Sequence, residues 1–501
     1  MGCTTILVGK NASYDGSTLV ARTEDSSAGE FTSKKVIVVR PDDQPKVYKS
    51  VISHVTVELP ENPLQYTSTP DAPATQGIWG EAGINSANVA MSATETLTTN
   101  ERVLGADPLV AYIPAKGNPE SADFVAEKPG GIGEEDFLTL VLPYIKSARE
   151  GVLRTGQLLE KYGTYESNGI AFSDVNEIWW LETIGGHHWI AKRVPDDSYV
   201  TMPNQLGIDS FDLDDAEAEG LTHLASPDLR AFIEENFLNP SFDGTLNPRE
   251  AFGSHSDADH VYNTPRAWYM QKVLNPNSGE WNGPNPALTP FSDNIPWSRQ
   301  PERKITIEDI NYVLSSHYQG TKYDPYSNAG SEQDRGMFRP IGINRHSQMA
   351  ILQIRPYRPE SSRSIQWMAF ASNPFNTLIP LFTNVDCIPE YLSDTTGRVT
   401  TENFYWVSRI IAALADAHFA DTIADIERYQ EKTLAAGHSA VKATDLALSK
   451  INSEGAVVRE QLSAANSSIA DKVREQTDEV LDKILFIASN GMRNRFARSD
   501  N

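Results

Sequence analysis

The spacing of apolar residues divides the chain into a strand-rich part and a helical end. Short runs rich in β-branched residues, separated by Asn, Asp, Gly and Pro, predict strands. They are TTILVG, STLVAR, KVIVVR and VYKSVISHVTVEL near the start, NGIAFSD, EIWWLETI, HHWIAKRV and SYVTM in the middle, and SQMAILQIRPY and SIQWMAFAS later. The segment TQGIWGEAGINSANVAMSATET predicts a strand, a turn and a second strand.

Helical spacing predicts a helix from Glu134 to about Tyr162, with a boundary or kink at Pro143. PDLRAFIEENFL and TPRAWYMQKVL predict two shorter helices within a middle section rich in Pro, Asn, Asp and Ser. From Thr400 to Arg498 almost every residue fits a helical pattern. Strands early and late, with helices between and after them, predict an α+β fold.

Composition and charge narrow the function classes. The 501 residues are 40% hydrophobic and 22% charged, as in ordinary globular proteins. The formal charge of -24 disfavours nucleic acid and membrane surfaces as partners. We expect neither a signal peptide nor a membrane span, and two distant cysteines, Cys3 and Cys387, are typical of a reducing compartment, so the prediction is a cytoplasmic protein. No Gly-rich phosphate loop follows a predicted strand, so the sequence does not support nucleotide-dependent chemistry.

Cys3 lies close to the start of the chain, and local sequence predicts what lies beside it. Asp15-Gly16 is a strong hairpin signal between the first two predicted strands. Antiparallel pairing around that turn places Cys3 opposite about Thr23, within a residue or two. The segment Arg22 to Asp25 then lies next to the cysteine. Because side chains alternate along a strand, Arg22 and Asp25 both reach the thiol only if the chain bends or bulges near Thr23.

Removal of Met1 and Gly2 would give Cys3 a free α-amine. The thiolate is then a nucleophile and the amine, with an ordinary pKa of about 7.7 to 8.0, is a base close to neutrality. Arg22 would lower the thiol pKa, and Asp25 would orient the amine. The alternative is that Cys3 is a small buried hydrophobic residue of a strand.

These residues carry a resemblance to a known family. MGCTTILVGK, DGST, ARTED, EIWWLETIGGHHWIAKRVPDD and SYVTMPNQLGID resemble the bacterial cysteine dipeptidases (dipeptidase A type) of the N-terminal-nucleophile hydrolase superfamily, whose relatives include secernins, penicillin V acylases and bile salt hydrolases. The resemblance implies a four-layer αββα sandwich, a short propeptide, and cleavage of dipeptides through an acyl-enzyme without a metal or organic cofactor. The expected division is a propeptide at 1–2, a hydrolase core at 3–399 and a helical C-terminal extension at 400–501.

The resemblance also implies roles for single residues. Cys3 matches the nucleophile, and Arg22 and Asp25 match the Arg and Asp that follow it. Asn204 corresponds to an Asn whose amide helps to form the oxyanion hole, and Arg266 resembles a distal active-site arginine. A second oxyanion or substrate residue is expected in NVAMSATET, where Ser92 and Thr94 are candidates.

Several questions stay open at the level of sequence. A dipeptidase needs a carboxylate or several carbonyls for the substrate ammonium, and Glu24 and Glu95, expected in loops, are both available. HSDADH, at 255–260, is a rival metal-binding segment that would suggest a metallopeptidase.

The chain could also be an acylase of N-acyl substrates or a non-enzymatic, secernin-like interaction protein. The C-terminal helices either cap the core or join copies into a homo-oligomer, and Met1 and Gly2 leave by self-cleavage or through an aminopeptidase.

Overall fold

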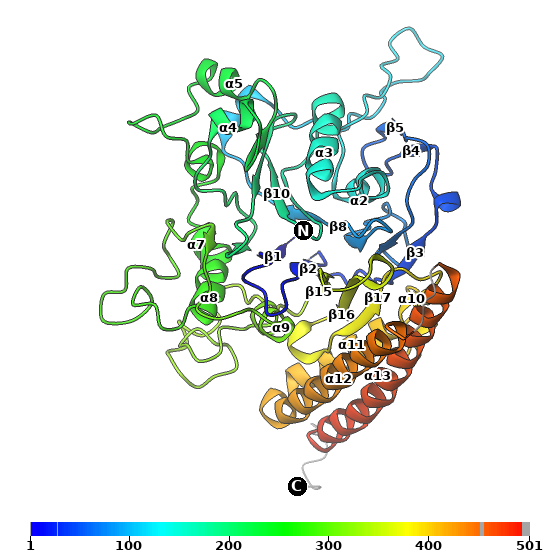
Figure 1. Cartoon of the computed structure of the whole chain (residues 1–501). Helices are drawn as coiled ribbons and strands as arrows, with labels where there is room; N and C mark the ends of the chain where they lie inside the picture. The colour runs from blue at the N-terminus through cyan, green and yellow to red at the C-terminus, as the bar shows by residue number, and fades with distance from the viewer. Residues whose placement is uncertain (1, 28, 451–454, 493–501) are drawn as a thin grey trace.

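The computed structural model describes residues 2–27, 29–450 and 455–492. Within them, helices and antiparallel sheets combine into an α+β fold, as the sequence predicts (Figure 1). The larger sheet has seven strands in the order β14 (Ser298–Arg299), β12 (Tyr199–Met202), β1 (Cys3–Val8), β2 (Thr18–Asp25), β15 (His346–Ile354), β16 (Ser364–Phe370) and β17 (Ile379–Phe382).

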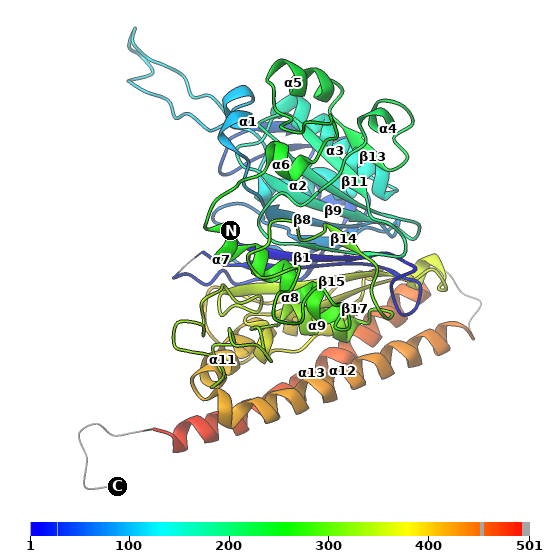
Figure 2. The same ribbon diagram turned by 90° about the vertical axis from the view of Figure 1, so that its left-hand side faces the viewer.

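A second sheet of six strands lies against the first. Its order is β13 (His223–Ala225), β11 (Trp189–Arg193), β10 (Ile178–Thr183), β9 (Asn168–Ser173), β8 (Ala90–Thr96) and β7 (Ala82–Ile84). The two sheets face each other, with β1 and β2 in contact with β8 (Figure 2). Two small sheets pair β3 (Ile37–Val39) with β6 (Tyr66–Ser68) and β4 (Val47–Lys49) with β5 (Thr56–Glu58). The run VYKSVISHVTVEL is therefore two short strands paired with each other.

Helices lie on the outer face of each large sheet. On the six-stranded sheet they are α2 (Glu134–Val141) and α3 (Ala148–Tyr162), separated by a turn of 3₁₀-helix at Leu142–Tyr144. This break confirms the boundary predicted at Pro143. Adjacent residues of β10 show how both faces are covered, because Trp179 packs under these helices and Trp180 packs in the core between the sheets.

The C-terminal helices cover the seven-stranded sheet. They are α11 (Phe404–Ala417), α12 (Phe419–Leu448) and α13 (Ala456–Asn490), and they contact β16 and β17 (Figure 2). Buried residues of α12 recur every three or four positions, among them Ile426, Tyr429 and Thr433, which is the spacing of an amphipathic helix. The boundary at 399/400 stays a prediction, although these helices share the hydrophobic core of the sheet.

The shorter helices occupy the connections. They are α1 (Glu101–Ala106), α4 (Leu213–Glu217), α5 (Leu229–Glu235), α6 (Pro248–Phe252), α7 (Asp259–Tyr262), α8 (Thr264–Leu274), α9 (Ile307–Leu314) and α10 (Glu390–Ser393). The predicted helix TPRAWYMQKVL coincides with α8. Among the described helices, none combines the length and the apolar character needed to cross a membrane.

Asn466 of α13 closes the free edge of β17. Its Oδ1 accepts a hydrogen bond from the Phe382 backbone N–H at 2.9 Å, and its Nδ2 donates to the Phe382 carbonyl at 3.0 Å. Replacing Asn466 with leucine leaves both buried backbone groups without a partner. We expect the free energy of unfolding to fall by about 2–4 kcal/mol, measured by urea denaturation.

The exposed neighbour Ser467 provides the control, because Ser467→Ala on the same helix should change the unfolding free energy by less than about 0.5 kcal/mol. An Asn466→Leu protein as stable as the wild type would contradict the role of this side chain at the sheet edge.

Candidate active site

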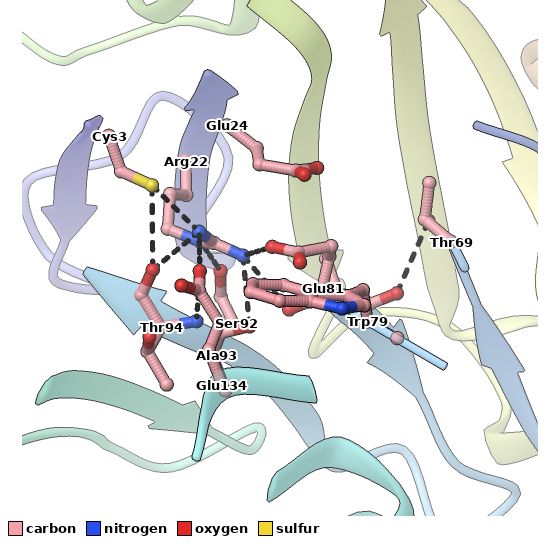
Figure 3. Close-up of polar contacts among 12 residues, drawn as sticks. Cys3, Arg22, Glu24, Thr69, Trp79, Glu81, Ser92, Ala93, Thr94 and Glu134 are labelled. Atoms are coloured by element: carbon pink, nitrogen blue, oxygen red, sulfur yellow. Dashed lines mark hydrogen bonds and ion pairs between the residues drawn. The ribbon is translucent and has the colours of Figure 1, made fainter. Parts of the chain in front are cut away.

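Cys3 begins β1, the strand that lies between β12 and β2 in the seven-stranded sheet. Its backbone pairs with Glu24, which confirms the predicted register within its stated margin. The thiol is fully buried, and Arg22 Nη1 donates a hydrogen bond to Sγ at 3.1 Å. Sγ in turn lies 3.5 Å from the carbonyl oxygen of Thr94, to which it donates (Figure 3).

The surroundings of the thiol act on its pKa in opposite directions. Burial raises the pKa of Cys3 well above its ordinary value, while the positive charge of Arg22 lowers it. The carboxylates of Glu95, Glu134 and Asp25 raise it further. With Gly2 still attached, Cys3 is therefore a neutral thiol, in agreement with its donation to Thr94.

Arg22 joins the two sheets at this point. From β2 its guanidinium donates to Ser92 Oγ at 2.9 Å and to the carbonyl oxygens of Ala93 and Thr94 at 3.0 and 2.6 Å, all on β8 (Figure 3). It also forms a buried ion pair with Glu81. These partners fix the guanidinium beside Sγ, as expected for a group that stabilises a thiolate.

Asn204 and Arg266 hold the main chain of Cys3. Asn204 Oδ1 accepts from the Cys3 backbone nitrogen at 3.2 Å, and its Nδ2 donates to the Thr96 carbonyl at 2.9 Å. Arg266, on α8, donates to the Cys3 carbonyl and, at 2.8 Å, to Asn204 Oδ1. The structure thus brings both residues to Cys3, while the proposed oxyanion role of Asn204 stays a prediction.

Asp25 lies beside Gly2 rather than beside the sulfur. Its backbone N–H donates to the Gly2 carbonyl at 2.9 Å, and its carboxylate forms ion pairs with Arg339 and, at 3.5 Å, with Arg345. His346 Nε2 lies 3.3 Å from the same carboxylate, but burial lowers the pKa of His346 to about 4, so this imidazole is neutral at pH 7. Burial alone would raise the pKa of Asp25, but these neighbours, Arg339 first, outweigh burial and lower it.

The strand irregularity at this end of the sheet lies in β15 and not in β2. β2 keeps a regular register with β1 as far as Glu24, and the register shift lies in β15, between His346 and Gln348. Because β2 stays regular, Arg22 and Asp25 point to opposite faces of the sheet, so the condition under which both would reach the thiol, a bend or bulge near Thr23, is not met.

Gly2 has no room for a side chain. A Cβ at this residue would lie 2.3 Å from the Tyr262 hydroxyl oxygen and 2.7 Å from Asp25 Oδ2. The residue joined to the Cys3 nitrogen is therefore enclosed by Asp25 and Tyr262. Its removal would open a small space directly beside the Cys3 nitrogen.

Glu24 and Glu95 lie on the strands β2 and β8, so their expected placement in loops is wrong. In the rival segment HSDADH, His255 contacts the Glu250 carbonyl and His260 contacts Asp293. Among the described residues, no three His, Cys, Asp or Glu side chains are arranged to hold a metal ion.

A set of buried charges next to Arg22 was not expected from the sequence. Glu81 precedes β7 and Glu134 begins α2, and each carboxylate pairs with Arg22, the Glu134 oxygen at 3.5 Å from Nη1. Lys34 Nζ lies 2.9 Å from Glu24, 2.7 Å from Asp71 and 3.5 Å from Glu81. No local motif marks these residues, since they meet only where the two sheets pack together.

The chain is similar to a family of known peptidases over most of its length. The family model described as Peptidase family C69 matches residues 2–432. The chain is 60% identical over the full length of both chains to a protein named Dipeptidase from Bifidobacterium longum (strain NCC 2705). It is 55% identical, again over both full lengths, to Probable dipeptidase A from Streptococcus pyogenes serotype M3 (strain SSI-1), and 44% identical to Dipeptidase A from Lactobacillus helveticus, with 96% of each chain covered.

Proposed function

The chain belongs to peptidase family C69, and from this premise we propose that it is a cysteine-type dipeptidase that hydrolyses the peptide bond of unblocked dipeptides with Cys3 as nucleophile. The observation that carries the proposal is the placement of Cys3, whose sulfur contacts Arg22 and whose backbone nitrogen contacts Asn204. The two large sheets with helices on their outer faces agree with the αββα sandwich of N-terminal-nucleophile hydrolases, which we include in the proposal.

The proposed reaction begins after Met1 and Gly2 have left. The free α-amine of Cys3 takes the thiol proton, and the thiolate attacks the carbonyl carbon of the dipeptide. Asn204 donates to the developing oxyanion through the second hydrogen of its amide, the first being held by Thr96. The carbon–nitrogen bond breaks, the leaving amine takes the proton, and a thioester on Cys3 remains. Water then attacks the thioester, and the thiol is regenerated.

Arg266 and Asp25 are proposed to position the reacting groups of Cys3 rather than to take part in the chemistry themselves. Arg266 fixes the Cys3 carbonyl and Asn204 together, so that amine, sulfur and oxyanion donor keep one geometry. Asp25 keeps its charge despite burial and lies where the Gly2 carbonyl is attached to the Cys3 nitrogen, so it is suited to orient the amine once that carbonyl is gone.

The test is to combine intact mass with activity on the same purified material. We expect the mass of a chain that lacks Met1 and Gly2, hydrolysis of Ala-Ala into free alanine, and loss of that activity after treatment with iodoacetamide. Fully active protein whose Edman degradation begins with methionine or glycine would overturn the proposal. Hydrolysis of N-acetyl-Ala-Ala in preference to Ala-Ala would instead indicate an acylase.

A further inference from the structure

The geometry of attack on the scissile carbonyl limits where the ammonium group of a bound dipeptide can lie. The ammonium nitrogen lies about 2.5 Å from the scissile carbonyl carbon, two covalent bonds away. An attacking sulfur lies about 3–3.5 Å from that carbon, and a carboxylate oxygen holds an ammonium at about 2.8 Å. The carboxylate that recognises an unblocked dipeptide must therefore lie within about 9 Å of Sγ.

Glu134 meets this requirement. Arg22 Nη1 lies 3.1 Å from Sγ and 3.5 Å from Glu134 Oε1, so the sulfur and this oxygen are separated by at most the sum of the two distances, about 6.6 Å. Glu134 is 1% exposed, and its Oε1 also accepts from the Thr94 backbone N–H at 3.4 Å (Figure 3). Its other oxygen, Oε2, is buried and has no hydrogen-bond partner among the described residues.

The charges around Glu134 are unbalanced toward the negative. In the described part of the chain, the two cations Arg22 and Lys34 are paired with four carboxylates, which we call the acidic cluster: Glu24, Asp71, Glu81 and Glu134. Buried carboxylates without a counter-charge are costly, so the acidic cluster must take up protons or a cation. Asp71 also lines an open cavity of about 370 Å³, which brings the acidic cluster to the surface on that side.

Two other nearby carboxylates, Glu24 and Glu81, each have a closer ion pair than Glu134, whose oxygen lies 3.5 Å from Arg22. Glu24 pairs with Lys34 at 2.9 Å, and Glu81 pairs with Arg22. Glu95 accepts from the Thr5 hydroxyl at 2.7 Å, and the charge that acts on it most strongly is the attractive one of Arg266. For Glu134, as for Glu24, the strongest acting charge is the repulsive one of Glu81, but among the described residues Glu134 has only its longer ion pair with Arg22 to offset it.

We propose that Glu134 binds the α-ammonium of the substrate and thereby selects unblocked dipeptides. This proposal rests on the proposed function and deepens it. The ammonium would supply the cation that the acidic cluster lacks and would place the scissile carbonyl within reach of Cys3.

The test compares a blocked with an unblocked substrate in Glu134→Gln, which keeps the shape of the side chain and removes its charge. We expect kcat/KM for Ala-Ala to fall about 100-fold or more, mainly through KM, and kcat/KM for N-acetyl-Ala-Ala to stay the same or rise. An unchanged ratio between the two substrates would overturn the role of Glu134. No hydrolysis of Ala-Ala by the wild type would contradict the proposed function instead.

Glu95→Gln is the matched control, because Glu95 is also fully buried near Cys3 and also has one oxygen without a hydrogen-bond partner among the described residues. It should leave the preference for Ala-Ala over N-acetyl-Ala-Ala unchanged. Should Glu134→Gln fail to fold, Glu134→Asp decides, since it keeps the charge and shortens its reach. A KM that rises for Ala-Ala but not for N-acetyl-Ala-Ala supports the proposal, and an unchanged KM for Ala-Ala overturns it.

A pH profile gives an independent readout. Burial first, and then Glu81 and Glu166, raise the pKa of Glu134 to about 8. Only the ionised form pairs with an ammonium, so KM for Ala-Ala should fall as pH rises from 6 to 7.5, by up to about tenfold per pH unit. The slope should be absent in Glu134→Gln. Among the described residues, the titratable and charged groups that face Glu134 are Cys3 on β1, Arg22 on β2, Glu81 before β7 and Glu166 before β9.

Discussion

Cys3→Ala is expected to lower kcat/KM for dipeptide hydrolysis by about four orders of magnitude or more, because the variant has no atom that can form the thioester. The loss should not reflect unfolding. The side chain removed is small, and its polar contacts are one hydrogen bond from Arg22 and one to Thr94. We therefore expect the free energy of unfolding to change by only about 1 kcal/mol. Initial rates on Ala-Ala, together with urea denaturation, measure both quantities.

The second cysteine provides the control. Cys387 is free and exposed, far from Cys3 in the sequence, and Cys387→Ala should keep full activity. In a Cys387→Ala background, alkylation by iodoacetamide reports on Cys3 alone, so the rate of modification should equal the rate of inactivation. Full activity in Cys3→Ala would rule out the nucleophile and favour a non-enzymatic role.

Local sequence was sufficient to predict the part of the site that one hairpin builds. The turn at Asp15-Gly16 fixes the register of β1 and β2, so Cys3 and Arg22 could be placed together before any tertiary contact was known. The α8 helix that carries Arg266 was equally clear from its periodicity. Asn204 could be identified only through family resemblance, since nothing in the local pattern links it to a residue 201 positions away.

The remainder of the site depends on how the two sheets pack, which hydrophobic periodicity does not encode. Glu81 and Glu134 reach Arg22 from the other sheet and from the start of its covering helix, at sequence separations that no local pattern spans. Buried acidic residues also run against the usual preference of Glu for the surface, so sequence reasoning places Glu24 and Glu95 in loops and gives no sign of Glu81 and Glu134. The bulge at this end of the sheet lies in β15, a strand that meets β2 only in the folded sheet, so the sequence of the hairpin gives no signal for it.

We propose that the charge of Arg22 has both a structural and a chemical role, and substitutions can separate the two. Arg22→Met leaves Glu81 and Glu134 buried without its charge. We expect the free energy of unfolding to fall by about 3–5 kcal/mol, measured by urea denaturation. Activity should fall as well, because Sγ loses the cation that donates to it and the thiol pKa rises.

A compensated variant decides between the two roles. In Arg22→Met/Glu81→Leu, both partners of the buried Arg22–Glu81 ion pair are replaced by apolar groups. Such a replacement is often neutral or stabilising in other proteins. We therefore expect the double variant to regain at least about half of the unfolding free energy that Arg22→Met loses. Hydrolysis of Ala-Ala should not return, since nothing replaces the cation beside the sulfur. The pH dependence of alkylation by iodoacetamide should show the raised thiol pKa in both variants. Recovery of activity together with stability would mean that Arg22 only supports the fold, and that the thiolate at Cys3 forms without it.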